Sequence, residues 1–444
     1  MKHVVIIGNG IAGITAARHI RKRSDYRITV ISGETEYFFS RTALMYVYMG
    51  HMEFEHTKPY EDWFWKKNRI ELLKTWITEI DFTNQELHCS SGQPIKYDEL
   101  ILAVGSKPNK FGWPGQDLPG VQGLYSFQDL ELMEQNTSQN KISNAVIVGG
   151  GLIGVEMAEM LMTRGISVTF LVRESRFWGN VLPEEEGRLI ECHLLEHHVE
   201  LKFNTELAEI IPGDAGRVAS VRTSKGEEIQ CEFVGLTTGV RPNIDFLQNT
   251  DIQTNRGVLV NQYLTTNMAN VYAIGDCAEI TEPSKGRRSI EQVWYTGRMM
   301  GETVARTICG EPTEYRPGIW FNSAKFFDIE YQTYGTVLPE LAVNQDQFYW
   351  ERGQVGFKMI FEKDSKKVIG VNLFGLRMRH EVWDAWLTAE KTADFVIEYL
   401  RDANFDPELY KKYESEIVAS YNLQTGASVS LKKRSWKRIL SKSY

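Results

Sequence analysis

The chain has 444 residues, of which 42% are hydrophobic and 24% charged, and its formal net charge is −8. These values are typical of a globular protein of two to four domains, and the acidic balance argues against nucleic acid as a partner. The closest two of the five cysteines, Cys277 and Cys309, are 32 positions apart, which excludes CxxC spacing. We therefore expect a cytoplasmic protein in a reducing compartment, since the glycine motif described next begins too early to leave room for a signal peptide.

A glycine motif follows the first apolar segment of the chain. The run from Gly8 to Gly13, GNGIAG, comes after the strand pattern His3–Ile7 and before the helical pattern Ile14–Arg23 and a second strand, Arg27–Ile31. In this βαβ context the first glycine permits a tight turn and the second lets the backbone approach a pyrophosphate. The third lets helix and strand pack closely. The pattern predicts a dinucleotide site at a helix N-terminus, where free N–H groups bind phosphate.

The same arrangement recurs about 140 residues later. The run from Gly149 to Gly154, GGGLIG, follows the strand pattern 145–148 and precedes a helical pattern over 155–164 and a strand over 167–172. Each copy later ends in an apolar strand and a Gly-x-x-Pro-Asn turn, which begins at Gly105 and at Gly239. Two copies predict an α/β protein with two Rossmann-like dinucleotide sites. One retained cofactor and one exchanging coenzyme, flavin and nicotinamide, are the obvious pair because hydride passes between them.

The remaining pattern indicates a change of architecture. A strand ending in Gly275 and Asp276 precedes a helical pattern over Glu291–Cys309. Aromatic strand patterns and then one helix follow, and strands followed by a helix favour an α+β domain. The expected strands are Lys325–Tyr334, Phe348–Glu351, Gly356–Phe361 and Val368–Phe374, and the expected helix is His380–Asp402.

The C-terminal end is basic. Residues 432–444 contain six lysines and arginines and no acid, and Trp436, Ile439 and Leu440 share one helical face. Such a segment can lie on an anionic membrane surface, or it can be a solvated terminus or an arm that folds back onto the acidic body. An apolar face of only three large residues favours the second interpretation.

In this order, the motifs resemble those of the two-dinucleotide-binding flavoprotein oxidoreductases, and most of all the ferredoxin-reductase and apoptosis-inducing-factor branch, over about residues 1–375. The resemblance implies a first part of an FAD-binding domain over 1–113 and an NAD(P)-binding domain over 114–240. It further implies a second FAD-binding part over 241–315, a C-terminal α+β interface domain over 316–425 and a basic tail over 426–444.

The resemblance also implies which residues contact FAD. Glu34, two residues past the second strand, would accept the adenosine ribose hydroxyls, Arg41 would lie near the flavin, and Asp276 would contact the ribityl and pyrophosphate part. A carboxylate suits a ribose diol and an arginine offsets pyrophosphate charge. Glu34 could instead be a solvated turn acid, and Asp276 a helix N-cap. The full set expected at FAD is Gly8, Gly10, Ile11, Ala12, Gly13, Glu34, Arg41, Ile77, Gly105, Gly275, Asp276, Glu291 and Trp320.

The second motif resembles the NAD(P)H site of the same family. Glu156 matches an acid that the family places on the first turn of the helix near the nicotinamide, where the helix dipole alone also favours an acid. NADH-using relatives carry an acid where this chain has Val172, followed by Arg173 and Glu174. This favours NADPH, although Glu174 could serve a ribose instead. The set expected here is Gly149, Gly151, Leu152, Ile153, Gly154, Glu156, Arg173 and Gly239.

One absence bears on the mechanism. Disulfide reductases of this superfamily carry redox cysteines near the flavin, whereas the matching region here, Phe38–Gly50, has none. A thiolate route is therefore not expected. Tyr46 also stands where many ferredoxin-reductase relatives have lysine. This difference leaves open how the region around the flavin N5 is tuned and whether the partner is an ordinary iron–sulfur protein. We expect hydride transfer from NAD(P)H to FAD without a catalytic side chain, although Glu156 and Glu291 are candidates near the flavin and nicotinamide.

Three functions remain open. The first is an NAD(P)H-dependent reductase of a small iron–sulfur or other protein electron carrier. The second is a peripheral membrane NAD(P)H:quinone oxidoreductase held by the basic tail at the inner face of the membrane. The third is a redox-sensing flavoprotein that acts mainly by binding a partner. An acidic carrier would need a basic docking patch, for which Arg287, Arg288, Arg298 and the tail are the candidates.

Overall fold

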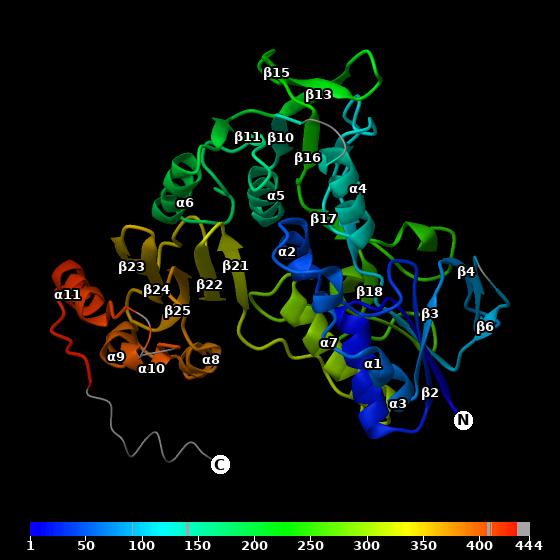
Figure 1. The fold of residues 1–444 in the computed structure, drawn as a ribbon. Helices are drawn as coiled ribbons and strands as arrows, with labels where there is room; N and C mark the ends of the chain where they lie inside the picture. Colours follow the sequence, from blue (N-terminus) through cyan, green and yellow to red (C-terminus); the bar gives the residue numbers. More distant parts are fainter. Residues whose placement is uncertain (91, 139–141, 406–408, 410, 433–444) are drawn as a thin grey trace. The chain divides into compact units, whose positions relative to one another are not determined.

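The computed structural model describes residues 1–90, 92–138, 142–405, 409 and 411–432. The chain divides into two compact units (Figure 1). The first unit comprises Met1–Leu171 and Thr205–Pro317, and the second comprises Val172–Asn204 and Gly318–Tyr444. The assignment of cofactor-binding segments to 1–113, 114–240 and 241–315, and of an interface domain to 316–425, stays a prediction.

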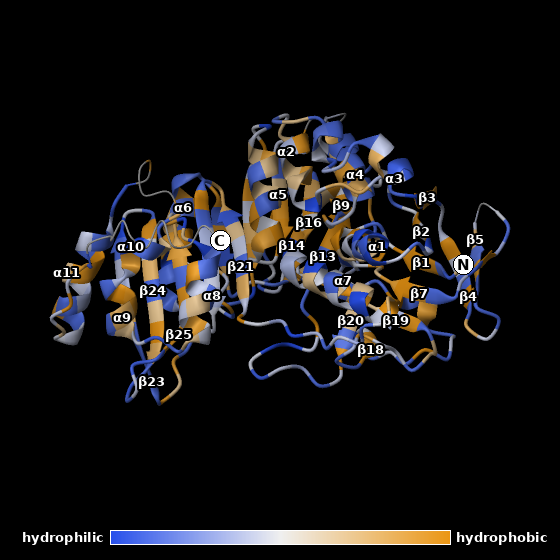
Figure 2. Ribbon diagram, turned by 90° about the horizontal axis from the view of Figure 1, so that it is seen from below, coloured by the Kyte–Doolittle hydropathy of each residue, from blue (hydrophilic) through white to orange (hydrophobic). Residues whose placement is uncertain are grey.

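A parallel sheet of five strands forms one core of the first unit. The strands lie in the order β19 (Val271–Ala273), β7 (Glu99–Leu102), β1 (His3–Ile7), β2 (Arg27–Ser32) and β3 (Ile70–Lys74). Because parallel sheets are covered on both faces, such strands are nearly continuous apolar runs. β1 and β7 are accordingly buried and hydrophobic (Figure 2).

Two helices that are far apart in the sequence lie side by side in this unit (Figure 1). They are α1 (Ile11–Arg23) and α7 (Trp294–Ile308). A Cβ on Gly301 of α7 would lie 2.5 Å from the carbonyl oxygen of Ala12 in α1, so the helices approach as closely as backbone allows. This contact places α7 against the N-terminal turn of α1.

A second parallel sheet of the first unit contains strands in the order β11 (Ser167–Val172), β10 (Asn144–Val148), β16 (Phe233–Leu236) and β9 (Val121–Gln122). Helix α5 (Leu152–Met162) follows β10, and α4 (Phe127–Ser138) precedes it. These two parallel sheets confirm the predicted α/β fold with two Rossmann-like cores.

Smaller elements complete the first unit. One antiparallel meander consists of β4 (Ile77–Asp81), β5 (Glu86–Cys89) and β6 (Ile95–Lys96). A second consists of β13 (Leu207–Pro212), β14 (Val218–Thr223) and β15 (Glu228–Gln230). Two strand pairs are β8 (Ser106–Pro108) with β17 (Val240–Pro242) and β18 (Val258–Val260) with β20 (Ala278–Ile280). The short helices are η1 (Arg41–Ala43), α2 (Leu44–Tyr48), η2 (Phe54–Thr57), α3 (Asp62–Lys67), η3 (Asp245–Leu247) and η4 (Gly275–Cys277).

The second unit contains an antiparallel sheet and several helices, which confirms the predicted α+β character of the C-terminal region. The strand order is β21 (Phe321–Phe326), β22 (Ile329–Gly335), β25 (Val368–Phe374), β24 (Val355–Glu362) and β23 (Gln345–Arg352). The helices are α6 (Glu184–Glu196), α8 (His380–Thr388), α9 (Ala393–Glu398), α10 (Leu400–Ala403) and α11 (Glu414–Thr425), and β12 (Glu200–Phe203) follows α6.

Two sequence expectations in this unit were wrong. The strand expected over Lys325–Tyr334 is two strands, β21 and β22, joined by a tight turn at Phe327 and Asp328. The helix expected over His380–Asp402 is three helices, because Glu390 has a positive φ of 48° and Thr392 caps a new helix. The Thr392 side chain accepts a hydrogen bond from the Phe395 N–H, which starts α9 in a new direction.

No helix among the described residues combines the length and the apolar character that crossing a bilayer would require. The basic tail lies outside the described residues from Lys433 onward. Lys432, the last described residue, forms an ion pair with Glu398 at 3.2 Å.

The contact between α6 and the sheet of the second unit is polar. Glu185 forms an ion pair with the buried Lys358 at 2.8 Å, and the buried Glu186 accepts a 2.8 Å hydrogen bond from Asn372. Burial raises the pKa of Glu186 to about 7, although the Asn372 hydrogen bond and the Lys358 charge oppose the shift. Ionised Glu186 is therefore destabilising in the folded protein.

Substituting Glu186→Gln tests whether burial raises the pKa of this carboxyl. Because the folded-state pKa lies above the ordinary value of 4.5, the carboxyl favours folding at low pH, and this advantage is lost as the pH rises towards 7. We expect the variant to be more stable than the wild type at pH 8, by about 1–3 kcal/mol, and nearly equal at pH 5. Thermal unfolding at both pH values measures this, with Glu184→Gln, an exposed neighbour in α6, as control. An unchanged pH dependence would contradict the assignment.

Candidate functional site

The first glycine motif forms the turn between β1 and α1. Gly8 has a φ of +112°, and a Cβ there would lie 2.0 Å from the carbonyl oxygen of Ala103. A Cβ on Gly13 would lie 2.1 Å from the carbonyl oxygen of Gly8, so the third glycine is needed for packing. A Cβ on Gly10 would meet nothing within 4 Å. The middle glycine thus faces open space, while its two neighbours in the motif are packed against backbone.

This open space lies in front of a helix N-terminus. Helix α1 begins at Ile11, and the first N–H groups of a helix lack intrahelical acceptors. They carry the positive end of the helix dipole, so they form an anion site. Asn9, which sequence reasoning missed, donates from Nδ2 to the carbonyl oxygen of Thr35 at 2.8 Å and holds the turn against the segment after β2. An asparagine inside the glycine motif was the available signal.

The second glycine motif repeats this geometry between β10 and α5. Gly149 has a φ of +107°, and its Cβ would lie 2.8 Å from the carbonyl oxygen of Thr237. A Cβ on Gly154 would lie 2.6 Å from the carbonyl oxygen of Gly149, whereas a Cβ on Gly151 would meet nothing within 4 Å. Thr238, which sequence reasoning also missed, has a buried Oγ1 without a hydrogen-bond partner among the described residues. Both motifs therefore provide a backbone cradle that fits a pyrophosphate.

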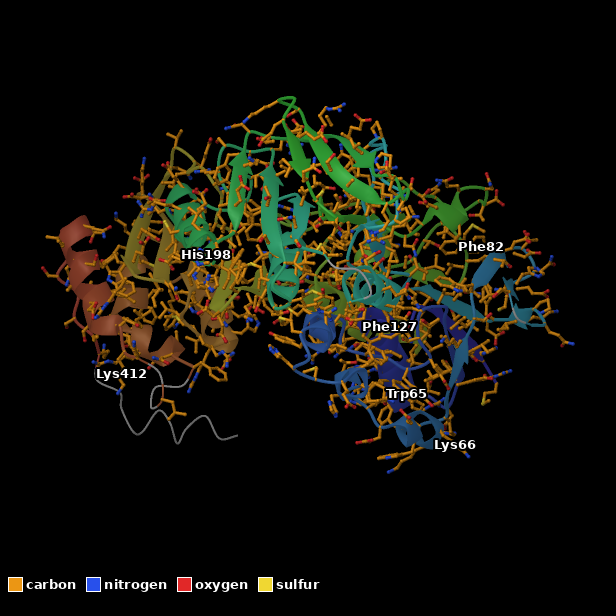
Figure 3. All side chains as sticks on the ribbon, turned by 45° about the horizontal axis from the view of Figure 1, so that its top comes forward. Trp65, Lys66, Phe82, Phe127, His198 and Lys412 are labelled. Carbon is orange, nitrogen blue, oxygen red and sulfur yellow. The ribbon has the colours of Figure 1, made fainter. Side chains whose placement is uncertain are left out.

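Glu34 and Arg41 form a close ion pair after β2. The Arg41 guanidinium donates to both carboxylate oxygens of Glu34, at 2.8 and 2.7 Å, and to the carbonyl oxygen of Tyr125 at 2.6 Å. The N–H of Phe127, at the start of α4 (Figure 3), donates to Glu34 at 2.8 Å. Burial lowers the pKa of Arg41, but the hydrogen bonds that it donates to Glu34 and the charge of that carboxylate outweigh the effect of burial, and the net shift is upward. Glu34 is thus an acid held by three N–H groups and not a solvated turn residue.

Asp276 lies close to the same group of side chains, in η4 after β19. Tyr125 donates from its hydroxyl to Asp276 Oδ2 at 3.1 Å and accepts from the N–H of Ser106 at 3.0 Å. Desolvation raises the pKa of Asp276 above its ordinary value, against the hydrogen bonds and the charge of Arg41. The structure therefore brings Glu34, Arg41 and Asp276 together through Tyr125, which sequence reasoning did not include.

Glu291 is in a closed ion pair. Its two carboxylate oxygens accept from Arg287, with the Nε bond at 2.6 Å, and Oε2 also accepts from Thr296 at 3.1 Å. Both side chains of the pair are nearly buried, at 6% exposure for Glu291 and 7% for Arg287. Arg287 is therefore not part of an exposed docking patch, contrary to expectation. Arg288 and Arg298 are exposed, and Arg298 forms an ion pair with Glu302.

Four other expected residues lie at turns or strand ends of the first unit. Gly105 and Gly239 have positive φ values of +67° and +87°, and each lies directly before a short strand, β8 or β17. Gly275 has a φ of +72°, and its Cβ would lie 2.9 Å from the Cβ of Ala12 in α1. Ile77 is the first residue of β4 and is half-buried. Gly275 thus brings η4 onto the first turn of α1.

Three expected site residues lie outside the glycine turns. Glu156 is the fifth residue of α5, beyond the first turn where it was expected, so the helix dipole has little effect on it. Arg173 belongs to the second unit, is 70% exposed and forms a 3.0 Å ion pair with Glu174. Trp320 also belongs to the second unit, where it is half-buried immediately before β21.

All five cysteines are free thiols. Burial raises the pKa of Cys231 and Cys277 to about 12, and it also raises the pKa of Cys89 and Cys309. These four thiols are therefore poor nucleophiles at neutral pH. Cys192 is exposed on α6.

Comparisons with known proteins agree with this geometry. The family model described as pyridine nucleotide-disulphide oxidoreductase matches residues 2–301. Nitrite reductase [NAD(P)H] of Bacillus subtilis is 30% identical over 379 residues, which cover 84% of this chain and 46% of that protein. Rhodocoxin reductase of Rhodococcus erythropolis is 30% identical over 333 residues, which cover 73% of this chain and 76% of that protein. The chain spans about half the length of the nitrite reductase and of the B. subtilis assimilatory nitrate reductase electron transfer subunit.

Solved structures share the fold. An NAD-dependent persulfide reductase from A. fulgidus superposes with a TM-score of 0.82 at 24% identity, over 98% of this chain and 89% of that one. The motif matches, the repeated glycine turns and the extent of the family model point to one conclusion. The chain belongs to the pyridine nucleotide-disulphide oxidoreductase family.

Proposed function

We propose that this protein is an FAD-dependent NAD(P)H oxidoreductase that passes electrons to a small protein electron carrier. The observation that carries the proposal is the repetition of one glycine-turn geometry before α1 and before α5, since each turn provides a separate cradle for a dinucleotide. Two dinucleotides in one chain imply transfer of a hydride between them.

The first turn is assigned to FAD because several distant segments enclose it. The segment after β2, the linker around Tyr125, η4 and α7 all lie against or near α1. A retained cofactor needs many contacts, whereas an exchanging coenzyme needs an accessible site. The second turn is assigned to the nicotinamide coenzyme, for which the Thr238 hydroxyl beside it, without a hydrogen-bond partner among the described residues, is a candidate contact.

The residues at the first turn would have distinct roles. The N–H groups of α1 bind the pyrophosphate, and Arg41 offsets its charge. Glu34 holds Arg41 in place through two hydrogen bonds, and its predicted contact with the adenosine ribose stays a proposal. Asp276, kept near Arg41 by Tyr125, would accept hydrogen bonds from the ribityl chain. Bound FAD would supply hydride acceptance and the release of single electrons.

The acceptor is proposed from the relatives. Rhodocoxin reductase, the rubredoxin-NAD(+) reductase of Acinetobacter baylyi and the ferredoxin--NAD(+) reductase subunit of a Pseudomonas putida benzene dioxygenase system are named for protein carriers. An electron route without cysteine is supported by the raised pKa values of four of the five thiols, which make these thiols poor nucleophiles. The quinone alternative depended on the basic tail, and no observation among the described residues favours it.

NADPH is the proposed coenzyme, through Arg173. The fold itself accepts both coenzymes, since a water-forming NADH oxidase from Lactobacillus brevis was solved with NADH and its engineered form with NADPH. Selection therefore depends on local charge. Arg173 is exposed and could bind a 2′-phosphate, with Glu174 as its partner when no phosphate is bound.

Carrier reduction tests the proposed function. With NAD(P)H, the FAD-loaded protein should reduce a rubredoxin or a [2Fe–2S] ferredoxin with a kcat on the order of 10 s⁻¹. The rate should be unchanged after alkylation with iodoacetamide, which reacts with the exposed Cys192. A rate abolished by alkylation would contradict the thiol-free route. Faster reduction of a soluble quinone than of every carrier would contradict the acceptor class.

A matched pair of substitutions tests which turn binds which cofactor. Gly10 and Gly151 have backbone angles open to any residue and space for a side chain, so Gly10→Leu and Gly151→Leu should both fold. Gly10→Leu should lower the FAD content. Gly151→Leu should keep FAD and raise the coenzyme KM about tenfold or more, the cost of about 1–3 kcal/mol of overpacking. Loss of the same cofactor in both variants would rule out the assignment.

Arg173→Gln tests the coenzyme preference. Removing the cation should raise the KM for NADPH about tenfold and leave the KM for NADH unchanged, because NADH lacks the 2′-phosphate. Glu174→Gln keeps the cation and serves as the control, with no rise in the NADPH KM. An equal effect of Arg173→Gln on both coenzymes would show that Arg173 does not read the phosphate.

A further inference from the structure

Two histidines of the second unit lie on the same face of α6, at the C-terminal end of this helix. His193 and His197 are four residues apart, a spacing that places side chains one above the other on a helix. Asp328, in the tight turn between β21 and β22, lies next to them. One ligand atom from each of these three residues lies within 4.8 Å of the others. His198, labelled in Figure 3, follows directly in the chain and marks this end of the helix.

The buried His193 has an unusual contact with Asp328. The His193 side chain is only 1% exposed, and its Nε2 lies 2.7 Å from Oδ1 of Asp328. This Nε2 nevertheless makes no hydrogen bond of acceptable geometry among the described residues. The buried Nε2 thus lies beside a carboxylate without a well-formed hydrogen bond, so an ion bound between the two atoms can replace their direct contact. Asp328 is 70% exposed, so the ion can enter from solvent.

The second ring nitrogens already have partners. His197 Nδ1 lies 2.9 Å from the carbonyl oxygen of His193, to which it can donate, leaving the lone pair of Nε2 available. His193 Nδ1 lies 3.1 Å from the side-chain amide of Gln354 and 3.8 Å from Glu196 Oε2. The Glu196 carboxylate can accept the Nδ1 proton when Nε2 binds a metal, and Gln354 can accept it once its amide turns to present Oε1 in place of Nε2. Metal-ligating histidines need this outer hydrogen bond to fix their orientation.

We propose that His193, His197 and Asp328 bind a divalent transition-metal ion of the Zn²⁺ class. Two imidazoles and one carboxylate are the donors that suit such ions, and water would complete the coordination. Ligand atoms about 2.1 Å from one ion lie roughly 3.4 Å apart in a tetrahedron. The largest separation, up to 4.8 Å, must therefore shrink by about 1.4 Å, and the 2.7 Å separation of His193 Nε2 and Asp328 Oδ1 must open by about 0.7 Å. Rotation of the exposed Asp328 side chain and a small movement of the half-buried His197 supply this closure.

The turn that carries Asp328 supports a defined position for the ligand. Phe327 occupies the left-handed region at a φ of 54°, a strained conformation for an aromatic residue. Its ring packs against the His197 ring, with centroids 4.7 Å apart. The ion would link α6, from residues 172–204, to the β21–β22 turn more than 130 residues later. Since the unfolded chain lacks this arrangement, the ion would stabilise the second unit.

Metal titration of the tag-free, FAD-loaded full chain tests the proposal. Calorimetry with Zn²⁺ should give one ion per chain, Co²⁺ should show visible absorption bands of a nitrogen- and oxygen-ligated site, and either ion should raise the thermal midpoint. His197→Gln and Asp328→Asn remove surface-accessible ligands, and each should weaken binding at least about tenfold and abolish the midpoint shift. Thermal unfolding with a chelator checks that both variants fold.

Two control variants separate this site from adventitious binding. His198→Asn removes the neighbouring imidazole and keeps a residue that tolerates the positive φ of 63° at this position. Cys192→Ser removes the exposed thiol of α6. Both should bind the ion as the wild type does. Wild-type affinity in His197→Gln and Asp328→Asn, or an equal loss in either control, would overturn the proposal.

Discussion

The structure depends on a backbone turn that only glycine permits, placed directly before a helix. Gly8 combines a left-handed φ with a carbonyl oxygen where a Cβ would be, and Gly149 does the same in the second sheet. Each turn directs the N–H groups of the next helix to an open space and so provides an anion site. The surrounding elements of the first unit, including η4 at Gly275 and α7 at Gly301, are packed onto the first of these helices through further glycines.

Features encoded by adjacent residues could be predicted from the sequence, and features that depend on distant contacts could not. The glycine turns, β1 and β11 follow from short motifs and apolar runs, and the structure has them at the expected residues. The junction of Arg41 with Tyr125 joins positions 84 apart, and no local pattern indicates it. The break after α8 depends on a positive φ at Glu390, a residue that ordinarily favours continuing a helix.

The two units separate two kinds of chemistry. In the first unit charged side chains are paired with one another, as in the pairs of Arg41 with Glu34 and of Arg287 with Glu291. Side chains so paired can position and offset charge, but they are not free to transfer protons, which agrees with cofactor-borne chemistry. In the second unit the polar face of α6 is buried on a sheet. Its histidine pair is spaced H-x₃-H in the sequence, but the third ligand, Asp328, is more than 130 residues away, so no local pattern indicates the set.

Separate anaerobic titrations of the purified protein with NADPH and with NADH, followed by flavin absorbance near 450 nm, test the central claim most directly. Two dinucleotide sites that exchange hydride predict a yellow protein bleached by about one equivalent of coenzyme, with NADPH effective at the lower concentration. A yellow protein that neither coenzyme bleaches would keep the first site but contradict the oxidoreductase account. A colourless protein that does not bind added FAD would contradict both the assignment of the first site to FAD and the oxidoreductase account.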